Sequence, residues 1–239
     1  MTATELSLPA GAGLASQAHR LGWGRVAEGV TCTAPERPPP PGARRGPAGG
    51  GALRRITGVA ADAPGVQGFL GHEEVLRGYD VVAVRPGSEE AFAYCCEKAR
   101  HCDLISVDLC RRLPFRFRAQ TVRRALERGL HFEISYAGAL RSPALRKTLF
   151  SNARALAWAT QGEGLVVSSG ATAPLQLRAP PDVVNMATFF GLGDRAAKAA
   201  VTERCEAVLR AGARRRRLDG AVSGPPSFLE GGAARMDLG

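Results

Sequence analysis

Short apolar runs alternate with longer amphipathic stretches along most of the chain, and serine, proline or glycine marks the changes. Four runs have the length and composition of strands: residues 79–84 (YDVVAV), 103–107 (DLISV), 131–136 (HFEISY) and 165–169 (LVVSS). The stretches between them have helical spacing and begin at serine or end at glycine: residues 88–100, 119–129 and 142–162. This alternation predicts parallel strands joined by right-handed crossovers.

The same alternation extends toward both ends of the chain. Further strands are predicted at 5–8, 26–32 and 53–61, and further helices at 12–21 and 194–212. About seven strands with helices between them fit a barrel or a doubly wound sheet. Because no GxGxxG or Walker-type loop opens any of the helices, we expect an α/β fold of the TIM-like (β/α) barrel type.

The barrel domain is expected to span residues 1–213. Within it, residues 34–51 (APERPPPPGARRGPAGGG) are rich in proline, glycine and arginine, which predicts a long surface loop or a disordered insert. Residues 214–239 begin with RRRR and are expected to form a basic, disordered C-terminal tail.

A net charge of +10 and a pI near 10 favour a polyanionic partner, with nucleic acid first, because basic side chains that neutralise phosphates release condensed counterions. The alternative is coding bias, since 29 of the 32 basic residues are arginine in a chain also crowded with alanine, glycine and proline. No membrane partner is expected, because no apolar stretch is long enough to span a bilayer.

Neither the cysteines nor the histidines have metal-ligand spacing, so we expect no structural metal and no cofactor. Carboxylates at predicted strand ends also lack a histidine that would complete a metal cluster: Asp80, Asp103, Asp108 and Glu133. Glu133 lies inside a predicted strand, where a buried ion pair with an arginine is the ordinary role. The chain is therefore expected to have no catalytic residues.

The segment LVVSSGA (165–171) ends an apolar run at Ser168, Ser169 and Gly170. A nucleophile elbow would read GxSxG, and the preceding glycine is missing here, so we discount a nucleophilic serine. Two interpretations stay open. The amides and hydroxyls of this loop could bind a phosphate or the RNA backbone, as late strand ends of barrels do, or they could cap the next segment.

The segment CRRLPFRFR (110–118) is the most suggestive basic stretch. In an extended conformation, its arginines would lie together and Phe115 and Phe117 would lie on the other face. Either the rings stack on bases while the arginines pair with phosphates, or the rings fill the core, with Phe115 favoured for the core. The RNA-binding candidates are Arg85, Arg111, Arg112, Arg116, Arg118, Ser168, Ser169, Gly170 and Arg178.

Several blocks resemble, in order, those of the thirty-kilodalton protein subunit of ribonuclease P and ribonuclease MRP: YDVVAVRP, LPFRFR, ALERGLHFEISYAGAL and LVVSSGATAPLQLRAPPDVVNMATFFGLGDRAAKAAV. The resemblance covers residues 53–217 well and 18–30 more faintly. It implies a degenerate barrel related to metal-dependent phosphoesterases but without their metal ligands.

The resemblance also implies a non-catalytic role in which the RNA subunit cleaves precursor tRNA and the protein holds RNA and neighbouring proteins, including a small ferredoxin-like subunit. The alternatives are a metal-dependent phosphoesterase of the same ancestry and a protein-only scaffold. Residues 214–217 (Arg214, Arg215, Arg216 and Arg217) are candidates for nuclear import, so we predict a nuclear and nucleolar protein.

Overall fold

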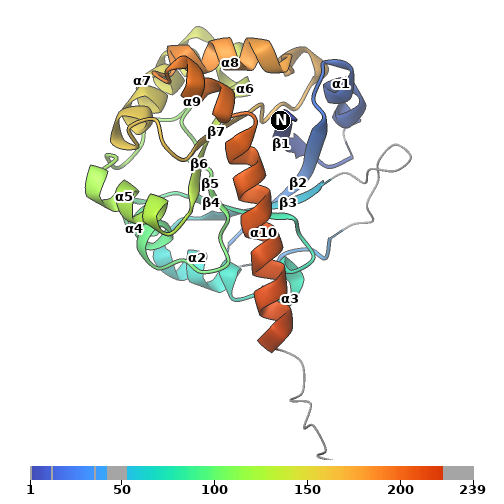
Figure 1. Ribbon diagram of the computed structural model, residues 1–239. Coiled ribbons are helices and arrows are strands. Elements are labelled where there is room, and N and C mark those ends of the chain that lie inside the picture. The colour runs from blue at the N-terminus through green and yellow to red at the C-terminus, as the bar shows by residue number, and fades with distance from the viewer. Residues whose placement is uncertain (1, 12, 35, 42–52, 223–239) are drawn as a thin grey trace, which may run out of the picture.

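A computed structural model describes residues 2–11, 13–34, 36–41 and 53–222, with side chains to residue 217. Seven parallel strands form one sheet in sequence order, each paired with the next (Figure 1). They are β1 (Thr4–Pro9), β2 (Arg25–Thr33), β3 (Leu53–Ala60), β4 (Val81–Pro86), β5 (Leu104–Ile105), β6 (His131–Ser135) and β7 (Leu165–Ser168). All seven strands predicted from the sequence are present, and they form the expected α/β barrel.

The seam between β7 and β1 is bridged by a third segment instead of a strand ladder. The Thr4 amide donates to the Val201 carbonyl at 2.9 Å, and the Val167 amide donates to the Ala200 carbonyl at 3.1 Å. At the other end of the seam, the Gly170 amide donates to the Ser7 carbonyl at 3.1 Å. The sheet is therefore a nearly closed barrel whose last gap is filled by residues 200–201.

Helices surround the barrel (Figure 1). They are α1 (Leu14–Arg20), α2 (Ala63–Leu70), α3 (Glu73–Leu76), α4 (Glu89–Glu97), α5 (Ala119–Glu127), α6 (Ala137–Arg141), α7 (Pro143–Ala159), α8 (Pro180–Phe189), α9 (Asp194–Ala199) and α10 (Glu203–Val222), with a 3-10 turn η1 (Pro174–Gln176). Ser88 and Ser142 cap α4 and α7 as expected, because their hydroxyls accept the Ala91 and Leu145 amides. None of the helices in the described ranges is long and apolar enough to cross a membrane.

The predicted helix 194–212 is two helices, α9 and α10, separated at residues 200–202. The break places the Ala200 and Val201 carbonyls at the barrel seam. Beyond it, α10 crosses one end of the barrel (Figure 1), where Cys205, Val208 and Leu209 pack against interior side chains that include Leu6 and Val81. This helix is the bottom plug of the barrel, because Asp80 and Asp103 beneath it immediately precede β4 and β5.

Gly212 lets the plug lie directly on the barrel. A Cβ atom at this position would be 2.1 Å from the Asp80 carbonyl oxygen, which is far inside van der Waals contact. One turn later, Arg215 is buried and forms an ion pair with Asp103, with Nη2 and Oδ2 3.0 Å apart. Residues 208, 212 and 215 share one helical face.

The predicted boundary between residues 213 and 214 is therefore wrong, because α10 continues without interruption to Val222. Arg216 also pairs with the barrel, 3.0 Å from the Asp80 carboxylate, whereas Arg214 and Arg217 are exposed. The sequence interpretation failed because a run of four arginines suggests a solvated segment, yet one helical face of that run is buried. The part of the predicted tail at 223–239, like residues 35 and 42–51 of the predicted loop, lies outside the described residues.

Candidate functional site

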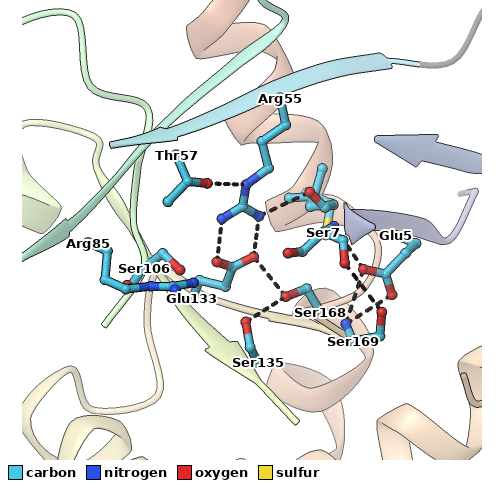
Figure 2. Close-up of polar contacts among 12 residues, drawn as sticks. Glu5, Ser7, Arg55, Thr57, Arg85, Ser106, Glu133, Ser135, Ser168 and Ser169 are labelled. Atoms are coloured by element: carbon cyan, nitrogen blue, oxygen red, sulfur yellow. Dashed lines mark hydrogen bonds and ion pairs between the residues drawn. The ribbon is translucent and has the colours of Figure 1, made fainter. Parts of the chain in front are cut away.

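The candidate site is a layer of polar side chains inside the barrel toward the carboxyl ends of the strands (Figure 2). Because side chains alternate along a strand, Arg55 and Thr57 of β3 face the interior together with Glu133 of β6 and Ser168 of β7. In TIM barrels, this end of the barrel carries the active site. The chemistry available in the layer therefore decides what the barrel mouth can do.

A bidentate ion pair between Arg55 and Glu133 fills the centre of the layer. The two guanidinium nitrogens lie 2.5 and 2.6 Å from the two carboxylate oxygens, and both side chains are buried. Arg55 also donates to the Thr57 hydroxyl and the Leu6 carbonyl, each at 3.0 Å, while the Ser168 hydroxyl donates to Glu133 at 2.7 Å. The expected burial and pairing of Glu133 with an arginine is confirmed.

The electrostatics keep Glu133 ionised. Burial alone would raise its pKa, but the charge and hydrogen bonds of Arg55, together with hydrogen bonds from Ser106 and Ser168, lower the pKa to about 2. Both carboxylate oxygens accept hydrogen bonds, so Glu133 is neither a proton donor nor an available base at neutral pH. The guanidinium occupies the interior that a catalytic cation would need. Among the described residues, no three His, Cys, Asp or Glu side chains form a metal-binding cluster.

A second carboxylate, Glu5, joins the two strands at the seam. It is fully buried, accepts the Ser7 amide at 2.9 Å and accepts the Ser169 amide at 3.0 and 3.1 Å. Burial raises its pKa to about 7, even though the two amide hydrogen bonds act in the opposite direction. Glu5 therefore binds its proton more tightly in the folded chain than in the unfolded chain.

This difference predicts a stability change between pH 4.5 and pH 7. In that window the folded state holds the Glu5 proton and the unfolded state has released it, so the free energy of unfolding falls as pH rises. Glu5→Gln should remove this dependence and stabilise the chain at pH 8 by on the order of 2 kcal/mol. Urea unfolding of both proteins at pH 5 and pH 8 measures it. An equal pH dependence in the two proteins would contradict the assignment to Glu5.

The loop of Ser168, Ser169 and Gly170 at the end of β7 has a structural role inside the barrel. Ser168 and Ser169 are fully buried, and the Ser169 and Gly170 amides donate to Glu5 and to the Ser7 carbonyl. Gly170 has φ of +58° and a Cβ there would lie 3.2 Å from that of Ser135. The interpretation of Ser168, Ser169 and Gly170 as RNA contacts is therefore wrong for this conformation, because their donors are used within the chain.

Arg85 and Arg178 lie close to the barrel mouth and make mostly structural contacts. Arg85 is half-buried beside the polar layer (Figure 2), and its Nε donates to the Ser106 carbonyl at 3.3 Å. Arg178 donates through Nη1 to the Leu175 and Leu177 carbonyls at 2.7 and 2.8 Å. Its carbonyl accepts the indole nitrogen of buried Trp23 at 2.9 Å. Arg178 therefore fixes the loop before α8.

Residues 110–118 lie along the outside of the barrel mouth, between β5 and α5. Phe115 is buried and stacks on Phe92 with ring centroids 4.8 Å apart, so its predicted place in the core is confirmed. Phe117, which the sequence left undecided, is half-buried and meets both rings edge-on. Both phenylalanines therefore anchor the segment through ring contacts with Phe92.

The four arginines of this segment are exposed but not equivalent. Arg111 pairs with Asp108 at 3.0 Å, and Arg118 pairs with Glu89 at 2.8 Å. Arg112 and Arg116 have no carboxylate partner within the part of the chain that the structure describes. Considering the described residues alone, the predicted arginine surface thus contains two free cations and two that are already paired.

Sequence reasoning missed the buried roles of Arg55, Glu5 and Arg215, three ionisable side chains that link elements of the barrel. Arg55 lies in LRRITGVAA, where the strand pattern was recognised but the inward-facing arginine was not singled out. The signal that could have identified Arg55 is a charged residue at a strand position that faces the barrel interior, with an opposite charge, Glu133, inside another strand. For Arg215, the signal was the spacing from Val208 and Gly212 on one helical face.

Comparisons with known proteins agree with this architecture. The sequence profile of the family described as RNase P subunit p30 matches residues 12–217. The mouse protein "Ribonuclease P protein subunit p30" is 36% identical over 171 residues, which is 72% of this chain and 63% of the mouse protein. The Schizosaccharomyces pombe "Probable ribonuclease P protein subunit 3" is 36% identical over 135 residues, 56% of this chain and 57% of that protein.

The Arabidopsis thaliana "Protein GAMETOPHYTE DEFECTIVE 1" is 41% identical over 131 residues, 55% of this chain and 22% of the relative, so the chain spans only part of these proteins. A chain in the "cryo-EM structure of archaeal Ribonuclease P with mature tRNA" has the same fold, with a TM-score of 0.61, 8% identity and 98% coverage of both chains. The family match over residues 12–217, together with the barrel, shows that this chain belongs to the RNase P subunit p30 family.

Proposed function

We propose that the chain is a non-catalytic protein subunit of the ribonuclease P and ribonuclease MRP ribonucleoproteins. In this role it supports RNA-catalysed removal of the 5′ leader of precursor tRNA, and rRNA processing. The observation that carries the non-catalytic part is the Arg55–Glu133 pair, which fills the barrel mouth with a neutralised and fully hydrogen-bonded network. The family membership and the net charge of +10 support the ribonucleoprotein part.

The proposed partners follow from that role. They are the RNA subunits of both particles, other protein subunits that include a small ferredoxin-like one, and precursor tRNA only indirectly. Nuclear and nucleolar localisation is part of the proposal. Of the predicted import residues, exposed Arg214 and Arg217 remain available to an import receptor, whereas Arg215 and Arg216 contact the barrel.

Arg112 and Arg116 are the first RNA contacts to test at the barrel mouth, because they are exposed and no carboxylate of the described residues pairs with them. Arg112→Ala with Arg116→Ala should weaken binding to ribonuclease P RNA and lower the log–log salt slope by about 1.4 to 1.8, if each contacts one phosphate. Stability should change by less than about 0.5 kcal/mol per site. Salt titrations of RNA binding, from low salt upward, make the measurement.

The matched control replaces Arg20 and Arg100, two exposed arginines on other elements, and should leave the slope close to that of the unmodified chain. A slope unchanged by the 112/116 pair would remove these residues from the RNA interface. Binding by the unmodified chain that does not weaken with salt would favour the protein-only scaffold. Metal-stimulated phosphodiester hydrolysis by the isolated chain, lost on substitution of Glu133, would contradict the non-catalytic role.

A further inference from the structure

A groove in the helical layer, outside the polar layer, has an exposed aromatic ring and arginines to which the proposed function assigns no role. It has a volume of about 670 Å³ and lies between α5, the end of α7 and the start of α9. Its walls include Arg123 and Leu126 of α5, Arg154 and Trp158 of α7, and the glycines Gly191 and Gly193 before α9. This volume is within the range of small-ligand sites.

Trp158 is the unusual feature of this groove. Its exposed fraction is 80%, whereas the other tryptophan, Trp23, is 1% exposed and hydrogen-bonded to Arg178. A large ring that remains in water gains nothing for the isolated fold. Its indole face is available, since no described aromatic residue contacts it. Arg154 lies one turn earlier on the same face of α7.

The groove also holds two cations that no described carboxylate neutralises. Arg123 and Arg154 are exposed and pair with no carboxylate within the described ranges, although the adjacent Arg124 pairs with Glu97 at 2.7 Å. The one acid in the lining, Glu163, faces Arg204 at 3.7 Å. The groove therefore combines a free aromatic face with an uncompensated positive charge.

These properties favour a nucleic acid over an apolar protein segment. Apart from Trp158, the apolar lining consists of Leu126 and alanines, and the other exposed large apolar residues, Leu175 and Phe189, do not line the groove. An apolar docking surface would need a continuous exposed patch. Stacking on an aromatic ring flanked by arginines is instead how single-stranded RNA is held.

We propose that this groove binds single-stranded RNA, with one base stacked on Trp158 and neighbouring phosphates paired with Arg123 and Arg154. The inference rests on the proposed role in a ribonucleoprotein. It adds a second RNA contact on the outer helices, and the groove begins at Ala119, three residues after Arg116.

Trp158 is itself the probe, because Trp23 is shielded from added RNA. Titrating the full chain with a ten-nucleotide single-stranded RNA without self-complementarity should quench tryptophan fluorescence to saturation. Trp158→Leu should abolish that quenching and weaken decamer binding about 5- to 140-fold, from the range measured for base stacking. Arg123→Ala with Arg154→Ala should lower the salt slope by about 1.4.

The matched controls are Leu175→Ala, an exposed apolar residue outside the groove, and Arg100→Ala, an exposed arginine with no carboxylate partner among the described residues. Both variants should bind the decamer as the unmodified chain does. Absence of quenching by the decamer, or full affinity in Trp158→Leu, would overturn the groove proposal. Stronger quenching by a decaglutamate peptide than by RNA would also overturn it and indicate an acidic protein partner. Failure of the unmodified chain to bind ribonuclease P RNA would instead overturn the proposed function.

Discussion

Glu133→Gln should destabilise the folded chain by about 3–5 kcal/mol, because it leaves the Arg55 guanidinium buried without its counter-charge. Arg55 is enclosed by β3 and the interior of the barrel, so it cannot turn to water when the carboxylate is removed. The glutamine has nearly the same volume, and the loss is therefore electrostatic instead of a cavity effect. Urea unfolding at pH 7, followed by circular dichroism, measures the change.

The same pair makes the stability of the fold sensitive to acid. The folded pKa of Glu133, about 2, lies below its unfolded value, so its contribution is complete above about pH 5 and is lost as pH falls toward 2. The double variant Arg55→Met with Glu133→Leu should recover most of the stability lost in the single variant, because apolar residues of similar volume can replace a buried pair. A single variant as stable as the unmodified chain would show that the pair is unimportant.

Arg215→Met should be the next most damaging change, at about 3 kcal/mol. The guanidinium donates to both Asp103 oxygens at 3.0 to 3.3 Å and to the Leu76 and Tyr79 carbonyls at 2.9 and 3.0 Å. Burial raises the pKa of Asp103 even with Arg215 beside it. In the Arg215→Met variant, the Asp103 carboxyl will therefore take up a proton more readily than in the unmodified chain. The main cost is then the loss of donors to buried oxygens.

Arg214→Met is the matched control, since Arg214 neighbours Arg215 on α10 but is exposed and unpaired among the described residues. It should change the free energy of unfolding by less than about 0.5 kcal/mol. Thermal and urea unfolding of the two variants make the comparison. Equal effects of the two substitutions would mean that α10 does not lie against the barrel as described.

The strands were predictable because each is an apolar run that ends at a turn residue, a local signal. The helices α2, α3, α6 and α8 were not predicted. Two of them, α2 and α8, contain two to three glycines or prolines, which mask the helical pattern. The other two, α3 and α6, are only 4 and 5 residues long. Helices of that length depend on tertiary packing. Local pattern therefore gave the sheet and only part of the helical layer.

The polar contacts of the site depend on long-range pairing that the sequence does not display. Arg55 and Glu133 are 78 residues apart, and Ser169 meets Glu5 across 164 residues. The buried role of Ser168 was hidden for the same reason, since a serine at a strand end has the same local pattern whether it faces solvent or another strand. The free cations, by contrast, could be located only once Asp108 and Glu89 were seen to neutralise their neighbours.

The bridge between the β1–β7 seam and residues 200–201 has a consequence for synthesis on the ribosome. β1 leaves the exit tunnel early, but the Thr4 amide finds its acceptor only when Val201 has been made. Until then one edge of the nascent sheet stays open, and open edges invite pairing with other chains. We therefore expect barrel closure to await the synthesis of residues 200–201, and to be slow because it joins segments that are far apart in the sequence.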